Sequence, residues 1–156
     1  MAILLKEGDR APLFMAQTQG GATVSLADLR GQAVVLYFYP RDNTPGCTKE
    51  ACGFRDAWKE IQQAGAVVLG VSTDSVKSHE KFAAKFKLSF PLLADVDKKI
   101  AKDYGVWGAK KFMGFLHMGV HRMTFLIGAD GTIRKIWAKV KPPEHAAEVL
   151  AALKNL

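Results

Sequence analysis

The residues with the clearest chemical potential lie in one short segment that contains both cysteines of the chain. Residues 40–52 read Pro-Arg-Asp-Asn-Thr-Pro-Gly-Cys-Thr-Lys-Glu-Ala-Cys, and they follow an unbroken apolar run that predicts a buried strand over residues 33–39. Pro45 suits the first turn of the helix that the apolar spacing predicts over residues 45–63. Cys47 is therefore expected at a helix N-terminus, where unpaired N–H groups and the helix dipole stabilise a thiolate. Because the thiolate is the nucleophile, Cys47 is a candidate reactive thiol.

The second cysteine, Cys52, stands five positions after Cys47 on the same predicted helix. A regular helix would place their Cα atoms roughly 8 to 9 Å apart, which exceeds the limit of about 7 Å for a disulfide. A bond between them therefore requires the helix to unwind locally. This geometry suits a cysteine that reacts first with a small oxidant and only afterwards with its partner.

Other uses of two cysteines stay open on these grounds alone. Both can be small buried apolar side chains, as free cysteines often are. A zinc site is disfavoured because the four histidines lack the paired spacing of zinc fingers; they are His79, His117, His121 and His145. Simple dithiol exchange is disfavoured because its cysteines usually stand two residues apart at a helix start.

Length and composition indicate an ordinary folded protein. The 156 residues, 49% of them apolar, suit one domain over residues 1–156. We find neither an apolar run long enough to span a membrane nor a secretory signal, so we expect a cytoplasmic protein without a membrane partner. The net charge of +7 invites a nucleic-acid interpretation. The basic residues are dispersed, however, and we expect solvated faces and no nucleic-acid partner.

The apolar patterning predicts strands that alternate with helices. Beyond the elements around Cys47, we expect a short helical turn over residues 25–31 and strands over residues 67–72 and 90–94. Between these two strands we expect a helix that Asp74 or Ser75 caps and that runs to about residue 87. A short helix over residues 98–104 should follow the second strand. Two strands over residues 122–127 and 133–140, joined around Asp130-Gly131, and a helix over residues 144–153 complete the chain. This order predicts an α/β protein with a mixed central sheet flanked by helices, the outline of a thioredoxin-like fold.

The segment that contains Cys47 resembles a known family. Pro40, Thr44 and Cys47 match the Pro-x-x-x-Thr-x-x-Cys signature of the peroxiredoxins, and residues 46–52 resemble the subgroup named bacterioferritin comigratory protein or peroxiredoxin Q. Residues 8–12, 71–74 and 121–127 resemble further blocks of the family in the same order. The resemblance implies a thioredoxin-like fold and a Cys47–Cys52 disulfide, with Cys47 as the peroxidatic and Cys52 as the resolving cysteine. It also implies that Pro40, Thr44 and Arg122 shape the site.

Each of these three residues has a chemical role that fits the resemblance. Arg122 is always protonated, so it stabilises a thiolate, and its planar fork can hold a neighbouring oxygen at the same time. The hydroxyl of Thr44 can accept a hydrogen bond from a peroxide and donate one to the thiolate. Pro40 would end the strand and shield Cys47 from water.

Four further features, Glu50 in the motif and three in the stretch that precedes or adjoins Arg122, receive more ordinary interpretations. Glu50 is expected as a solvated helix residue, with an ion pair to an arginine as the alternative. His117 and His121 are expected as hydrogen-bonded structural histidines. Residues 112–120 are more apolar than is usual in the family, and we interpret most of them as core or loop packing, with an apolar wall for alkyl hydroperoxides as the functional alternative.

The resemblance implies a reaction in three stages. The Cys47 thiolate reduces hydrogen peroxide or an alkyl hydroperoxide and becomes a sulfenic acid, Cys52 condenses with it to a disulfide, and a thioredoxin or similar dithiol restores both thiols. Neither a metal nor an organic cofactor is required, and we expect a monomer. Two rival functions are a redox-regulated chaperone that exposes apolar surface on oxidation and a basic nucleic-acid-binding module.

Overall fold

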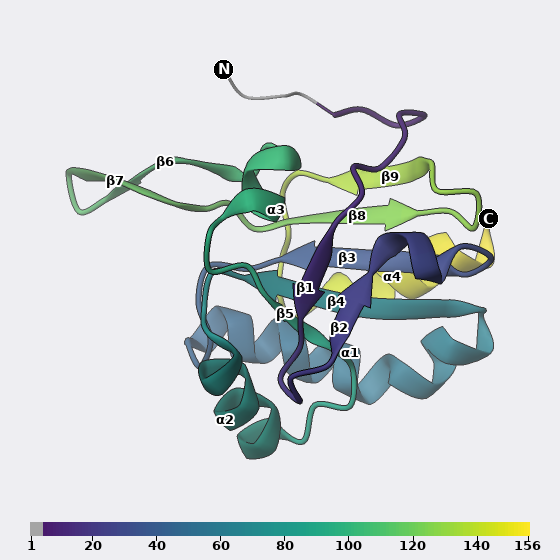
Figure 1. Ribbon diagram of the computed structural model, residues 1–156, viewed down its shortest axis with the longest axis horizontal. Coiled ribbons are helices and arrows are strands. Elements are labelled where there is room, and N and C mark those ends of the chain that lie inside the picture. The colour runs from purple at the N-terminus through teal and green to yellow at the C-terminus, as the bar shows by residue number, and fades with distance from the viewer. Residues whose placement is uncertain (1–4) are drawn as a thin grey trace.

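A five-stranded mixed sheet forms the centre of the protein. The computed structural model describes residues 5–156, apart from the side chain of Phe112 (Figure 1). The strands follow the order β5-β4-β3-β8-β9 and comprise β3 (Ala33–Phe38), β4 (Ala66–Ser72), β5 (Leu92–Ala94), β8 (Met123–Ile127) and β9 (Ile133–Trp137). β3, β4 and β5 are parallel, whereas β8 pairs antiparallel with both β3 and β9. The predicted mixed sheet is confirmed, although the last two strands are shorter than expected.

Helices cover both faces of this sheet. They are α1 (Pro45–Gln63), α2 (Val76–Phe86), α3 (Lys99–Asp103) and α4 (His145–Lys154), with a 3-10 turn, η1, at Leu26–Leu29. The side chains of β3 alternate between two cores: Val35 and Tyr37 pack with residues of α1, α2 and α4, and Val34 and Leu36 pack with residues of α3 and η1. All six residues of β3 are buried, which explains why its sequence is an unbroken apolar run.

The helix boundaries follow local signals in the sequence. α1 begins at Pro45, as predicted. Ser75 caps α2, since its side chain accepts a hydrogen bond from the N–H of Ser78 at 3.1 Å. No helix among residues 5–156 is both long enough and apolar enough to cross a membrane.

Two small hairpins were absent from the sequence-based prediction. β1 (Met15–Gln17) pairs with β2 (Thr23–Ser25), and β6 (Trp107–Phe112) pairs with β7 (Phe115–Val120). Met113 and Gly114 connect β6 to β7 with φ values of 50° and 83°, a left-handed pair that reverses the chain within two residues. Figure 1 shows this second hairpin extending away from the body of the protein.

Val120 is buried, but the interpretation of Met113, Phe115, Leu116 and Met118 as core or loop packing is wrong. β7 pairs with its neighbour in sequence and not with the central sheet, so several of its apolar side chains remain exposed.

Candidate active site

Cys47 lies where the sequence places it, in the first turn of α1 and just beyond the carboxyl end of β3. The N-cap residue is Thr44, whose backbone is extended, and Pro45 occupies the first helical position. Cys47 is almost fully buried in the core that contains Tyr37 and Tyr39. Its sulfur is thus held at a helix N-terminus in surroundings of low polarity, where helix N–H groups and neighbouring charges act strongly on a thiolate.

Arg122 reaches this sulfur from a distant part of the chain. It directly precedes β8, whose residue Met123 pairs with Phe38 at the end of β3. Its Nη2 donates to the Cys47 Sγ at 3.3 Å, and its Nη1 donates to the Glu50 Oε1 at 2.7 Å. Burial disfavours the Arg122 charge, but Glu50 and Cys47 outweigh that effect and raise its pKa. A permanent positive charge therefore lies beside the thiol.

Glu50 is buried, so its interpretation as a solvated helix residue is wrong and the alternative ion pair is present. It lies nearly one helical turn after Cys47 and faces the same side, which turns its carboxyl group toward the core and Arg122. Burial raises the pKa of Glu50 to about 7, although Arg122 acts in the opposite direction. Within residues 5–156, the Glu50 Oε2 has no hydrogen-bond partner.

The other two predicted site residues belong to the loop between β3 and α1. The Thr44 hydroxyl donates to the Arg41 carbonyl at 3.0 Å, so its hydrogen is not directed at the Cys47 sulfur. Its lone pairs remain available to accept a hydrogen bond from a substrate. Pro40 is half-buried and follows the end of β3. Just before it, the N–H of Tyr39 donates to the Val71 carbonyl at 3.0 Å, the final hydrogen bond between this strand and β4.

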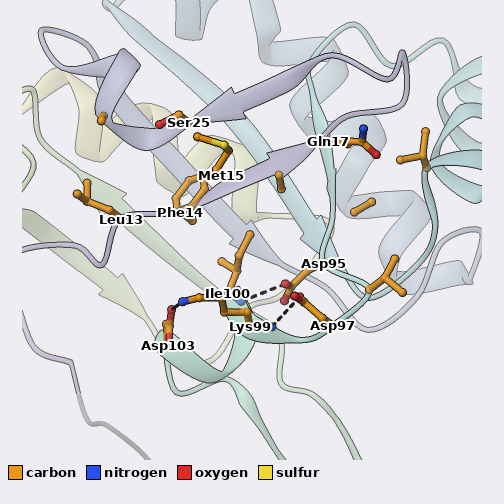
Figure 2. A pocket seen from close by; sticks show the side chains of 15 residues that line it. Leu13, Phe14, Met15, Gln17, Ser25, Asp95, Asp97, Lys99, Ile100 and Asp103 are labelled. Atoms are coloured by element: carbon orange, nitrogen blue, oxygen red, sulfur yellow. Dashed lines mark hydrogen bonds and ion pairs between the residues drawn. The ribbon is translucent and has the colours of Figure 1, made fainter.

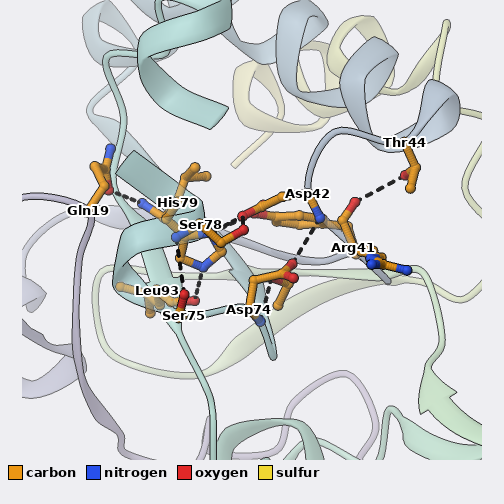
Figure 3. Close-up of polar contacts among 12 residues, drawn as sticks. Gln19, Arg41, Asp42, Thr44, Asp74, Ser75, Ser78, His79 and Leu93 are labelled. Carbon is orange, nitrogen blue, oxygen red and sulfur yellow. Dashed lines mark hydrogen bonds and ion pairs between the residues drawn. The ribbon is translucent and has the colours of Figure 1, made fainter. Parts of the chain in front are cut away.

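A second polar cluster fixes this loop, and the sequence-based prediction did not include it. We name it the Asp42 network; its members are Tyr39, Asp42, Asp74, Ser78 and His79. Figure 3 labels the last four of these residues. The Asp42 N–H donates to Asp74 at 2.8 Å. The Asp42 Oδ1 accepts from Tyr39 at 2.6 Å, and its Oδ2 accepts from Ser78 at 2.8 Å and lies 2.7 Å from the His79 Nδ1. Both oxygens of a buried carboxylate are thereby engaged.

The hydrogen bonds of His79 show where the protons between His79 and Asp42 lie. The His79 Nε2 lies 2.9 Å from the Leu93 carbonyl oxygen, which only accepts, so Nε2 carries a hydrogen. The 2.7 Å contact between the His79 Nδ1 and the Asp42 Oδ2 requires a further proton between these two atoms, so both ring nitrogens are engaged. Asp42, Asp74 and His79 also bring ligand atoms within 4.8 Å of one another, but His79 has no free nitrogen lone pair for a metal.

A sequence signal for this network does exist. Asp42 and Asp74 each follow the carboxyl end of one of two adjacent parallel strands, β3 and β4, and such positions meet at one edge of a sheet. His79 lies in the first turns of the helix that follows β4. The strand order, and not the motif, would have identified these residues.

The two histidines that precede Arg122 are also placed differently from the prediction. His117 and His121 are both exposed, so their interpretation as structural histidines is wrong. The buried histidines are His79 and His145. The His145 Nε2 lies 2.7 Å from the Thr124 Oγ1, and burial lowers the pKa of His145.

Cys52 shares α1 with Cys47 but has a different environment. It is partly exposed, whereas Cys47 is buried, and both thiols are free. α1 is continuous through both positions. A separation of roughly 8 to 9 Å between their Cα atoms follows from regular helix geometry, so a disulfide between them requires local unwinding.

A large cavity lies elsewhere. It has a volume of about 830 Å³ and is lined by residues of β1, α3 and the segment after β5, including Leu13, Met15, Asp95 and Ile100 (Figure 2). Asp95 accepts hydrogen bonds from the N–H groups of Ile100 and Ala101, at 3.0 and 2.8 Å, and so caps α3. None of the predicted site residues lines this cavity, so it is separate from the thiol chemistry.

Comparisons with known proteins show which proteins this chain is similar to. The model of the AhpC/TSA family matches residues 7–136. A putative peroxiredoxin Bcp of Coxiella burnetii is 50% identical over 149 residues, covering 96% of this chain and 99% of that protein. Peroxiredoxin Bcp of Escherichia coli is 47% identical over 151 residues, covering 97% of each.

A similar solved structure is that of the bacterioferritin comigratory protein of Xanthomonas campestris, whose description refers to alkyl peroxide reduction activity. It superimposes with a TM-score of 0.88 at 39% identity, covering 99% of this chain and 98% of that one.

Proposed function

Because the chain belongs to the AhpC/TSA family and is a peroxiredoxin, a thiol peroxidase of the Bcp and peroxiredoxin Q group, we propose that Cys47 reduces hydrogen peroxide and alkyl hydroperoxides and that Cys52 resolves the product. The observation that carries this assignment is the hydrogen bond from Arg122 to the Cys47 sulfur at the start of α1. Arg122 stabilises the thiolate and can donate to the peroxide oxygen at the same time. The alkyl hydroperoxides are included because the Xanthomonas relative is described as reducing alkyl peroxides.

In the first step, the Cys47 sulfur attacks one peroxide oxygen and the O–O bond breaks. An S–O bond forms, the leaving oxygen takes up a proton, and water or an alcohol departs, which leaves Cys47 as a sulfenic acid. The lone pairs of Thr44 are free to accept from the incoming peroxide, and the half-buried Pro40 restricts access of water to the sulfur. Charge that builds on the leaving oxygen is stabilised by the Arg122 guanidinium.

In the second step, the first turns of α1 unwind and the Cys52 thiolate attacks the Cys47 sulfur. A disulfide forms and one water is released. A dithiol such as a thioredoxin then reduces the disulfide and is itself oxidised, which restores both thiols. These exchange reactions fit a reducing compartment such as the cytoplasm. All the site residues come from one chain, so we propose that a monomer is sufficient for turnover.

Mass spectrometry after one equivalent of hydrogen peroxide tests both cysteine roles together. The wild type should lose two hydrogens as the disulfide forms, whereas Cys52→Ser should gain one oxygen at Cys47. Cys47→Ser should remain unmodified, and its peroxidase turnover should be abolished. Oxygen addition at Cys52 in the Cys47→Ser variant, at the wild-type rate, would reverse the assigned order.

A further inference from the structure

The hairpin of β6 and β7 ends in exposed apolar side chains that the thiol chemistry does not use. We name this cluster the hairpin tip; it consists of Met113, Phe115, Leu116 and Met118, whose exposed fractions are 82%, 77%, 73% and 54%. A group of large apolar side chains that face water marks a binding surface. Because Figure 1 shows the hairpin extending from the body of the protein, the tip is accessible from several directions.

The register of the hairpin places apolar side chains on both of its faces. Leu116 pairs with Lys111 and Met118 pairs with Ala109, so these residues share one face. Phe115 precedes Leu116 in the same strand and therefore points to the opposite face, while Met113 occupies the turn. The surface of a protein partner would cover one face of such a hairpin. A layer of lipid headgroups would surround it on both faces.

The area of the tip also argues against a second copy of the chain as the partner. A stable dimer buries about 800 Å² on each partner. Four side chains at the end of a two-stranded hairpin, none of them fully exposed, present less area than this.

The charges on the hairpin suit an anionic surface. Lys110 and Lys111 stand on opposite faces just behind the tip, and the sequence contains no Asp or Glu between residues 104 and 129. Lys111 is exposed, and the Lys110 Nζ donates to the Val120 carbonyl at 2.9 Å. A short apolar end with basic residues behind it is the pattern by which interfacial segments bind anionic bilayers.

We propose that the hairpin tip inserts into the interfacial layer of an anionic lipid bilayer, with the exposed Lys111 at the level of the headgroups. Insertion is shallow, about 5 to 10 Å, and no part of the chain crosses the membrane. β7 is followed directly by His121 and Arg122, so binding would hold the Cys47 site near the bilayer surface. The binding itself requires no thiol chemistry.

Co-sedimentation with vesicles tests this proposal on the reduced, full-length protein. We expect binding to vesicles of phosphatidylcholine with phosphatidylglycerol, weak binding to phosphatidylcholine alone, and release as salt is raised. The double variant Phe115→Ser/Leu116→Ser should bind at least about tenfold more weakly, and Lys111→Gln about fivefold more weakly. Met15→Ser, at an exposed methionine on β1, is the matched control and should bind like the wild type.

Several results would overturn the proposal. They are absence of binding to the anionic vesicles at low salt, equal binding by the double variant, or equal loss of binding in Met15→Ser. Self-association that the double variant abolishes, without an effect on vesicle binding, would assign the tip to a second copy. If the double variant turned over peroxide more slowly than the wild type with thioredoxin, but not with a small dithiol, the hairpin tip would be assigned to binding of the reductant. Turnover of hydrogen peroxide with a small dithiol should be unchanged in the double variant, so failure of vesicle binding is distinguishable from failure of the thiol site.

Discussion

Two buried polar clusters lie at the start of α1, and they differ in how completely their charges are compensated. In the Asp42 network, both carboxylate oxygens of Asp42 have donors and both nitrogens of His79 are engaged. In the Cys47 cluster, meaning Cys47, Glu50 and Arg122, one arginine serves both the sulfur and Glu50, and the Glu50 Oε2 has no partner within residues 5–156.

This difference suits the Cys47 cluster to reaction with a substrate and the Asp42 network to holding its loop in place. A fully satisfied cluster has no capacity left for a substrate, but it holds its loop firmly. The Cys47 cluster retains unsatisfied capacity beside a nucleophile, which is what a site that binds and releases a peroxide requires. We therefore expect the loss of Arg122 from the Cys47 cluster to change rates and the loss of Asp42 from its network to change stability.

The largest effect is expected for Arg122→Met in the Cys47 cluster. Loss of the guanidinium removes the donor to the sulfur, so the rate of Cys47 oxidation should fall by about 100-fold or more. Stopped-flow measurement of the single oxidation step checks this. Arg134→Met, at an exposed residue of β9, is the control and should react like the wild type. An unchanged rate in Arg122→Met would remove Arg122 from the chemistry.

The second largest effect is expected for Asp42→Ala, and on stability instead of rate. The change removes the group that accepts hydrogen bonds from Tyr39 and Ser78 and that contacts the buried His79 Nδ1, which should lower the free energy of unfolding by roughly 3 to 5 kcal/mol in urea titrations. The double variant Asp42→Ala/His79→Leu should recover part of this loss, because both partners are then absent. Asp56→Ala breaks an exposed pair with Arg55 and should cost less than about 1 kcal/mol. A hundredfold loss of rate in Asp42→Ala with unchanged stability would contradict the division between the two clusters.

A smaller effect, dependent on pH, is expected for Glu50→Gln. Burial raises the pKa of Glu50 from its ordinary value of 4.5 to about 7, so the folded protein holds this proton more tightly than the unfolded chain. The stability that this proton contributes is present below pH 4.5 and is lost as pH rises through 7. The glutamine side chain cannot ionise, so the stability of the variant relative to the wild type should increase over this window, by on the order of 2 kcal/mol. Urea titrations of both proteins at several pH values measure it, and a difference that does not vary with pH would mean that Glu50 does not titrate there.

The smallest effect is a local one, in the oxidised protein. Formation of the Cys47–Cys52 disulfide should speed amide hydrogen exchange from about residue 47 to residue 55, because regular helix geometry holds the two Cα atoms too far apart. β3 and β4 should stay protected, and so should the Asp42 N–H, which the second cluster holds through Asp74. Identical exchange over α1 in the reduced protein and in a protein with a proven disulfide would show that α1 is not regular at its start.

Much of the site follows from local sequence. The apolar run of β3, the proline at the first helical position and the cysteine two residues later place a thiol at a helix N-terminus without any long-range contact. The strand and helix pattern also predicted the mixed sheet and its flanking helices, since periodicity reports which faces are buried. Arg122 was predicted as a site residue only from the family resemblance, because nothing in its local sequence indicates a partner 75 residues away.

The tertiary structure decided the rest, for reasons of pairing and burial. The antiparallel pairing of β8 with β3 brings Arg122 to Cys47, and Arg122 in turn makes a buried Glu50 tolerable where the sequence alone indicated a solvated residue. The order of β3 and β4 brings Asp42 and Asp74 together, and α2 supplies His79. The apolar side chains of the hairpin tip are exposed because β7 pairs with β6 alone. An apolar side chain is buried only when the topology supplies a surface to cover it, and a charged one is buried only when the topology supplies a partner.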